Sequence, residues 1–75
     1  MGFCANWVVQ ADASLRVDYT DAHGDPCSLA ITPSADGIAW AAVATYATWS
    51  GSARNVVSAM KDAEDLASTQ DWSEV

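Results

Sequence analysis

Positive charge is scarce in this sequence. Its 75 residues contain three basic side chains, Arg16, Arg54 and Lys61, against ten Asp and Glu, so the formal net charge is -7 with the histidine neutral. Direct nucleic-acid binding normally needs clustered Lys and Arg that displace counterions from phosphates, and an anionic membrane attracts the same kind of cluster. We therefore expect neither partner, and we expect long-range attraction to a cationic protein surface instead.

Long apolar runs are missing as well. The longest candidate, residues 38–49, covers about a dozen positions, whereas a membrane-spanning helix needs about 20. The N-terminal stretch lacks the basic start of a secretory signal, and Asn6 stands where a myristoylation motif has Ser or Thr. The length suits one hydrophobic core and no more. We expect residues 1–75 to form a single acidic, cytoplasmic domain.

Residues that usually carry chemistry are few. His23 is the single imidazole, so a Ser or Cys triad would have to use it. Cys4 and Cys27 have no CxxC spacing and too few partners for a zinc site. They could meet across two strands, but we interpret them as two half-buried thiols. The glycines are isolated, which excludes a glycine-rich phosphate loop. We predict no enzyme activity, no cofactor and no resident metal.

One loop leaves a metal-dependent alternative open. Asp21, His23 and Asp25 alternate within it, and two carboxylates with an imidazole could bind a divalent ion. A calcium loop of the EF-hand type would need Gly at the sixth position and an acid at the twelfth, where this chain has Pro26 and Thr32. We interpret the segment as a polar turn whose Asp side chains accept hydrogen bonds from nearby backbone.

The first half of the chain has the pattern of β-strands. Residues 3–10 are rich in β-formers, residues 14–20 alternate between apolar and polar side chains, and residues 27–32 do the same. The polar break at residues 11–14 has the length of a hairpin turn. The pattern predicts an antiparallel three-stranded sheet.

Two helices are expected to pack against this sheet, which gives an α+β fold. Residues 34–49 contain six alanines, follow Thr32 and Pro33, and end near Gly51, a candidate C-terminal cap. The Asp36-Gly37 pair can instead form a turn into a fourth strand. The alternative fold is therefore a four-stranded meander with one C-terminal helix.

The second helix is expected at residues 53–68, with Ser52 as its N-cap and a polar outer face. Its expected apolar face consists of Ala53, Val56, Val57, Met60, Ala63 and Ala67. The helical period is lost after Ala67, so residues 69–75 are expected to form a frayed tail.

Carboxylates concentrate in the last part of the chain. Asp62, Glu64 and Asp65 crowd one turn of the expected helix, and Asp71 and Glu74 follow in the tail. Spaced carboxylates can imitate a row of phosphates and occupy a basic groove on another protein. The alternative is that they only keep the protein soluble.

Trp72 is a large aromatic residue in a polar segment. It either folds back onto the core or is exposed, and an exposed Trp is a typical interface anchor. The predicted partner-binding set joins it to the five carboxylates: Asp62, Glu64, Asp65, Asp71, Trp72 and Glu74.

These features favour a non-enzymatic inhibitor or adaptor that docks on a basic surface of a larger protein, for example a nucleic-acid-binding one. Small acidic inhibitors, including those that phages make against bacterial defence nucleases of the CRISPR kind, are similar in general type, but no motif carries this analogy. Two alternatives stay open: a structural subunit that forms a homo-oligomer through residues 39–47, and the metal-dependent activity at the His23 loop.

Overall fold

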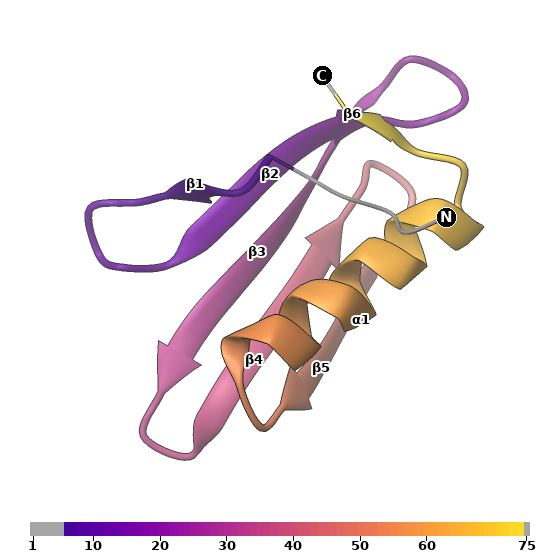
Figure 1. The fold of residues 1–75 in the computed structure, drawn as a ribbon. Helices are drawn as coiled ribbons and strands as arrows, with labels where there is room; N and C mark the ends of the chain where they lie inside the picture. Colours follow the sequence, from indigo (N-terminus) through magenta and orange to yellow (C-terminus); the bar gives the residue numbers. More distant parts are fainter. Residues whose placement is uncertain (1–5, 75) are drawn as a thin grey trace.

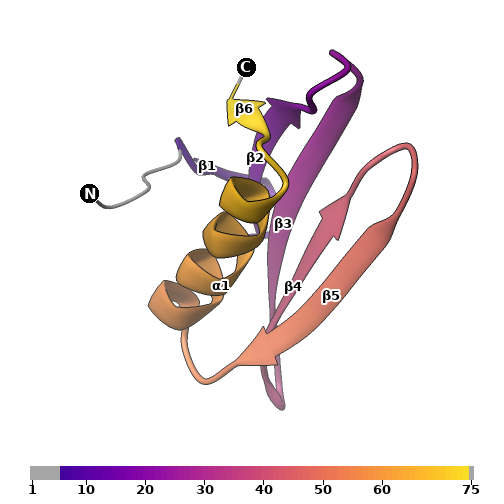
Figure 2. The ribbon, with the colours of Figure 1, turned by 90° about the vertical axis from the view of Figure 1, so that its right-hand side faces the viewer.

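A computed structural model describes residues 6–74 as one antiparallel sheet with a helix on one face (Figures 1 and 2). The strands lie in the order β1-β2-β3-β4-β5, and β6 pairs with β2 on the same side as β1. The elements are β1 (Val8–Val9), β2 (Leu15–Thr20), β3 (Pro26–Ser34), β4 (Gly37–Val43), β5 (Thr48–Ala53), α1 (Val56–Thr69) and β6 (Ser73–Glu74).

The core lies between the sheet and α1. Side chains alternate along each strand, so one face of the sheet is buried beneath the helix. Tyr19, Leu29 and Ile31 are the largest fully buried side chains, and burying a residue such as Leu29 contributes about 1.5–3 kcal/mol to stability. The helix meets this face with small residues at intervals of four, and each of them is completely buried: Ala59, Ala63 and Ala67.

The other face of the sheet has no covering layer among the described residues (Figure 2). Its central rows hold small, uncharged side chains, because the outward positions of β3, β4 and β5 are almost all Ala, Ser or Thr. The register aligns Ala30, Ala41 and Ser50 across the three strands. Arg16 and Asp18 on β2 add the charged pair of this face. The outer face is therefore nearly neutral, in contrast to the acidic chain as a whole.

Residues 34–49 do not form the predicted helix. They contain a turn, the strand β4, a second turn and the start of β5. Every residue of β4 pairs with β3 on one side, and most also pair with β5 on the other, so cross-strand contacts outweigh the helical preference of the alanines. The prediction of two helices was wrong. The alternative, a meander with one C-terminal helix, agrees better, although the sheet has further strands and β1 is much shorter than residues 3–10. Residues 3–5 lie outside the described part of the chain.

Gly51 is not a helix cap but a central position of β5. It pairs with Trp40 of β4, and a Cβ atom on Gly51 would come within 2.7 Å of the Trp40 indole ring. Only glycine leaves room for the ring to lie across the strand. The residue is therefore required by space rather than by its backbone conformation.

The helix α1 starts three residues later than the expected N-cap implies. Asn55 is the actual N-cap, and its side-chain oxygen accepts a hydrogen bond from the Ser58 N–H at 2.9 Å. This start turns Ala63 and Ala67 to the sheet, as predicted, but leaves Val57 75% exposed. Ala53 belongs to β5 instead of the helix.

The segment after α1 is ordered by a Schellman motif, and the predicted frayed tail was wrong. Asp71 adopts a left-handed conformation, with φ of 59°. The Trp72 N–H donates to the Ala67 carbonyl at 3.0 Å, and the Asp71 N–H donates to the Ser68 carbonyl at 3.2 Å. The chain therefore turns back, buries Trp72 and adds β6 to the edge of β2.

Replacing Gly51 by Ala tests the fit of the Trp40 ring. The variant Gly51→Ala is expected to lower the free energy of unfolding by about 1–3 kcal/mol, because the added methyl group overlaps the indole. Denaturant titration measures the loss. Ser52→Ala, on the open face of the same strand, is the control and is expected to change stability by less than about 0.5 kcal/mol. An equal loss in a Trp40→Leu background would contradict this account, since the smaller side chain removes the overlap.

The Schellman motif is tested at Asp71. Glycine has no Cβ clash at positive φ, so Asp71→Gly is expected to raise the free energy of unfolding by up to about 1 kcal/mol and the melting temperature by several degrees. Asp71→Val is expected to lower stability by at least about 1 kcal/mol, because a β-branched residue resists this conformation. Thermal unfolding followed by circular dichroism gives both values. If neither variant shifts the transition, residues 70–74 do not form this turn in solution.

Candidate functional site

Half of the ten carboxylates accept hydrogen bonds from other groups of the same chain. Asp12 accepts hydrogen bonds from the Ser14 hydroxyl at 2.6 Å and from its N–H at 3.1 Å, and these bonds lower the pKa of Asp12. Asp18 accepts from the Arg16 guanidinium at 3.0 Å. The remaining three engaged carboxylates are Asp21, Glu64 and Glu74. These groups hold turns and strands in place, so they are less suited to an external partner.

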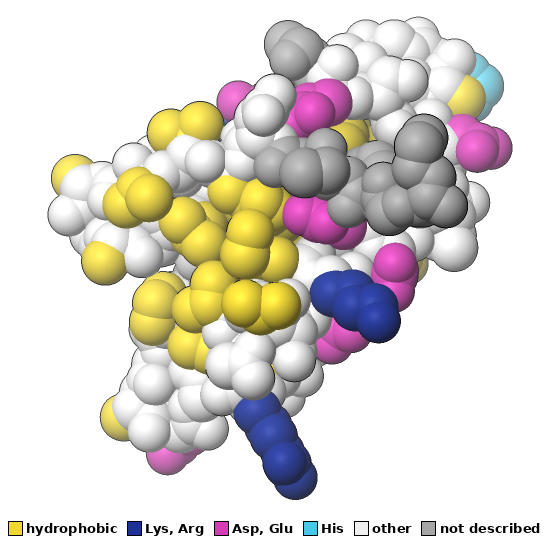
Figure 3. Space-filling view, in the orientation of Figure 1, with side chains coloured by type: hydrophobic (Ala, Val, Ile, Leu, Met, Phe, Trp, Pro, Cys, Tyr) yellow, Lys and Arg dark blue, Asp and Glu magenta, His cyan; other side chains and the backbone are white. Residues whose placement is uncertain are grey.

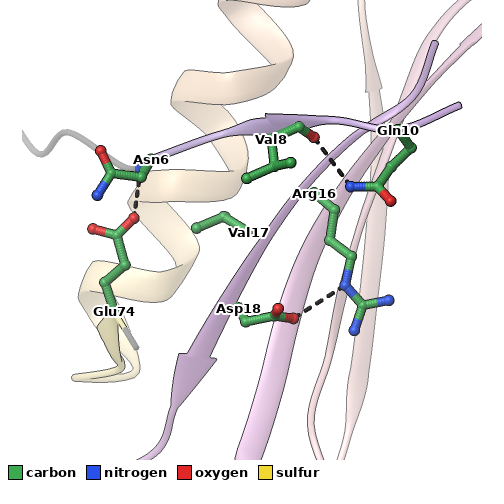
Figure 4. A pocket seen from close by; sticks show the side chains of 7 residues that line it. All are labelled: Asn6, Val8, Gln10, Arg16, Val17, Asp18 and Glu74. Carbon is green, nitrogen blue, oxygen red and sulfur yellow. Dashed lines mark hydrogen bonds and ion pairs between the residues drawn. The ribbon is translucent and has the colours of Figure 1, made fainter.

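Glu64 and Glu74 fasten the segment before β1 to the C-terminal elements. The Trp7 indole N–H donates to Glu64 at 2.6 Å, and this bond is partly buried. The Asn6 backbone N–H donates to the Glu74 carboxylate (Figure 4). Both residues belong to the predicted partner-binding set, but the structure gives them an internal role.

Asp62, Asp65 and Asp71 behave differently. All three are exposed, and within residues 6–74 none of them has a hydrogen bond or an ion pair from its carboxylate. In Figure 3, acidic side chains and a basic one lie over α1, further acidic side chains lie toward the end of the chain near β6, and apolar side chains gather between α1 and the β1-β2 hairpin. We call these three residues the acidic helix set.

Trp72 is buried and is not an exposed anchor. Its side chain is 5% exposed, and its indole N–H donates to the Tyr46 hydroxyl at 3.1 Å. Its ring makes an edge contact with Trp49 at 5.7 Å and a tilted contact with Tyr19 at 6.1 Å, both between ring centroids. Burial, with nearby carboxylates, raises the pKa of Tyr19, so this phenol stays protonated. Trp72 therefore belongs to the core, which is the first of the two roles considered for it.

Among residues 6–74, the exposed aromatic residue is Tyr46, which the sequence did not single out. It lies in the turn between β4 and β5, is 55% exposed, and packs edge-on against Trp49 at 5.9 Å. Its hydroxyl donates to Gln70 at 3.3 Å. The sequence pattern assigned Tyr46 to the helix expected at residues 34–49. A hairpin interpretation of the same residues would have placed it at a solvent-facing turn.

The loop around His23 is a polar turn with the hydrogen bonds expected of one. The Asp21 carboxylate accepts from the His23 N–H at 2.8 Å and from the Asp25 N–H at 2.9 Å. Asp21 is buried, whereas His23 and Asp25 point to solvent beside Tyr46 and Gln70. Within residues 6–74, no three His, Cys, Asp or Glu side chains are arranged to hold a metal ion. The geometry thus offers no support for the metal-dependent alternative.

Cys27 lies in the core as a free thiol, and Cys4 is outside the described residues. Burial raises the pKa of Cys27, and the nearby Asp21 carboxylate raises it further. A thiol in this environment stays protonated and is a poor nucleophile.

A pocket lies at the edge of β2, where β1 and β6 leave a gap (Figure 4). Its volume is about 490 Å³, and it is lined by polar side chains that include Asn6, Gln10, Arg16, Asp18 and Glu74. The pocket combines one guanidinium with two carboxylates, and no imidazole, thiol or hydroxyl side chain lines it. It has hydrogen-bonding groups but lacks a nucleophile with a base.

Residues 39–47, the predicted contact of a homo-oligomer, have a different conformation from the one expected. The Ala-rich segment is not a helix that could pack against a copy of itself, but the strand β4 and the turn after it. Its alanines alternate between the core and the open face, where Ala39 is exposed. Within residues 6–74, the only helix is too short and too polar to cross a membrane.

Comparison of the chain with protein-family models, with curated proteins and with solved structures gives no match. Functional inference therefore depends on the residues and their geometry.

Two substitutions on α1 compare the contribution to stability of a hydrogen-bonded carboxylate, Glu64, with that of a free one, Asp65. Glu64→Ala is expected to lower the free energy of unfolding by about 1–2 kcal/mol, because the Trp7 indole N–H loses its acceptor in a partly buried position. Asp65→Ala, one position further and exposed, is expected to be neutral or slightly stabilising. Denaturant titration of both variants makes the comparison. Equal effects would show that the Trp7 bond does not hold the N-terminal segment.

Proposed function

We propose that this protein is a non-enzymatic inhibitor or adaptor that docks through the acidic helix set, Asp62, Asp65 and Asp71, onto a basic surface of a larger protein. The observation that carries the proposal is the division of the carboxylates: these three are exposed and unpaired within residues 6–74, while Glu64 and Glu74 are engaged internally. Of the five free carboxylates, these three lie on one helix and the turn that follows it, whereas Asp25 and Asp36 lie in separate turns.

The placement of these charges does not favour the fold. Asp62 and Asp65 are three residues apart on α1, where like charges repel by a few tenths of a kcal/mol, and Lys61, four residues before Asp65, offsets part of this repulsion. Asp71 follows the C-terminal end of the helix, where the helix dipole disfavours negative charge. A cationic surface would relieve both effects and would also accelerate association by electrostatic steering. The arrangement therefore suits an intermolecular role better than a purely structural one.

The target class that best suits such a surface is a protein with a nucleic-acid groove, because these grooves concentrate Lys and Arg. A bacterial defence nuclease complex of the CRISPR kind, inhibited by a phage-type protein, is the specific case we propose. Inhibition would be steric: the acidic helix set would cover part of the groove and exclude the nucleic acid.

A competition experiment tests this proposal. Purified CRISPR-type effector complexes and other DNA-processing enzymes are each bound to fluorescent DNA, and displacement by the protein is followed by anisotropy. The parent protein is expected to displace DNA from at least one of them. The double variant Asp62→Lys/Asp65→Lys is expected to need at least about tenfold more protein, since both contacts become repulsive.

The matched control is Asp25→Lys/Asp36→Lys. These two carboxylates are also exposed and unpaired in the described part of the chain, but they lie in the turns before β3 and β4 and not on α1. Each double variant replaces two charges of -1 by two of +1, a change of four, so both have a formal net charge of -3. If both double variants displace DNA equally poorly, the total charge of the protein and not the surface of α1 governs binding. If the parent displaces DNA from no enzyme, the proposed function is wrong.

A further inference from the structure

The two edges of the sheet differ. At one edge, two short strands, β1 and β6, both pair with β2, and we call this the closed edge. At the opposite, open edge, β5 pairs with β4, and no strand among the described residues pairs with its other side. Figures 1 and 2 show β5 as the outermost strand, with α1 lying over the sheet and not across this edge. A row of backbone donors and acceptors is therefore unused along β5.

The turn before β5 determines which residues face outward. The Ala44 N–H donates to the Ala47 carbonyl at 2.9 Å, so these two residues form a hydrogen-bonded pair at the end of the hairpin. Pairs alternate along an antiparallel ladder, so Trp49, Gly51 and Ala53 bond to β4. The backbone groups of the intervening residues point to the open edge: Thr48, Ser50 and Ser52.

This edge lacks the features that usually prevent strand pairing. Proteins protect an edge with charged side chains, proline, a bulge or a very short strand. The closed edge has two strands of two residues each, whereas β5 has six residues in regular register with β4. None of these six residues is charged or proline.

Charge narrows the choice of partner strand. Two copies of a chain with net charge -7 repel each other unless they meet where carboxylates are absent. The strand β5 is such a place, and its neighbours on the open face, Ala39, Ala41 and Val43, are uncharged as well. A strand from a strongly basic partner would gain nothing from this neutral edge.

We propose that two copies of the chain associate through antiparallel pairing of β5 with β5, centred on Ser50. In this register Ser50 faces Ser50 of the second copy, and Thr48 faces Ser52, so each outward residue meets another outward residue. On the helix side, half-buried Trp49 faces Gly51 of the second copy and the Trp40 indole ring that lies over this glycine, so two aromatic side chains meet there. The strand is therefore complementary to itself.

The pairing would join the two sheets into one. A two-fold axis perpendicular to a sheet keeps both helices on the same face, so the two acidic helix sets would lie on one side of the dimer. A single added strand pair buries little area, so we expect a weak, concentration-dependent dimer.

Sedimentation velocity over a range of concentrations tests the proposal, at about 0.01 M and about 1 M salt. We expect a monomer-dimer equilibrium that shifts toward dimer at high salt, because salt screens the repulsion between acidic copies. Ser50→Pro removes the central outward N–H and is tolerated in an edge strand, so it is expected to abolish the dimer without unfolding the protein. Unchanged tryptophan fluorescence and an intact melting transition verify the fold.

Two lysine variants locate the contact. Ser50→Lys places like charges opposite each other on the two-fold axis and is expected to weaken the dimer at least tenfold, about 1.4 kcal/mol. Ser28→Lys introduces the same charge on the open face, two strands from the edge, and is expected to leave the dimer intact. A chain that stays monomeric at high salt overturns the proposal. So does a dimer that survives Ser50→Pro, or one that Ser28→Lys weakens as much as Ser50→Lys. Docking on a basic partner weakens with salt, so the two proposals can fail separately.

Discussion

Close contact between α1 and the sheet is the constraint on which the rest of the structure depends. Ala59, Ala63 and Ala67 have no side chain beyond Cβ, so the helix backbone lies near Leu29 and Ile31 and covers them completely. Larger residues at these positions would lift the helix and open the core. The chain has few large aliphatic residues, and it therefore obtains burial by close approach and by its aromatic side chains.

The same arrangement explains the distribution of charge. A helix that uses its small residues for packing presents its long, charged residues to solvent, and on α1 most of these are acidic. The Schellman motif then returns the chain to the sheet, and Trp72 closes the core next to Tyr19 and Trp49. As a result, the acidic surface and the neutral open face lie on opposite sides of a thin domain. One side suits a cationic partner, and the neutral edge at β5 suits a second copy.

Local patterns predicted the parts of the fold that depend on local physics. The alternation around Val17 and Tyr19, and around Leu29 and Ile31, predicted β2 and β3, and the spacing of Ala63 and Ala67 predicted α1. Residues 34–49 were assigned wrongly because alanine favours a helix locally, whereas the pairing of β4 with two neighbours decides the outcome. The residue pattern of one segment does not reveal which other segments it pairs with.

The candidate site was predicted only in part, for similar reasons. The exposure of Asp62 and Asp65 followed from the helical period, because the residues that define the buried face lie on the same helix. The internal roles of Glu64 and Glu74 depend on Trp7 and Asn6, which are more than 50 residues away in the chain. The turn at Asp71 gave no signal, since glycine is the usual residue at a left-handed helix end. The sequence therefore left both roles of Trp72 open, as part of the core and as an exposed anchor.

The central claim is that the exposed carboxylates of α1 and the following turn contact a cationic protein surface. Backbone chemical shifts of the isotope-labelled protein, recorded with and without a target enzyme from which it displaces DNA, test this most directly. The account predicts shifts or line broadening concentrated around Asp62, Asp65 and Asp71, with Asp25 and Asp36 unchanged. Perturbations confined to the open face of the sheet or to the pocket beside β2 would contradict it.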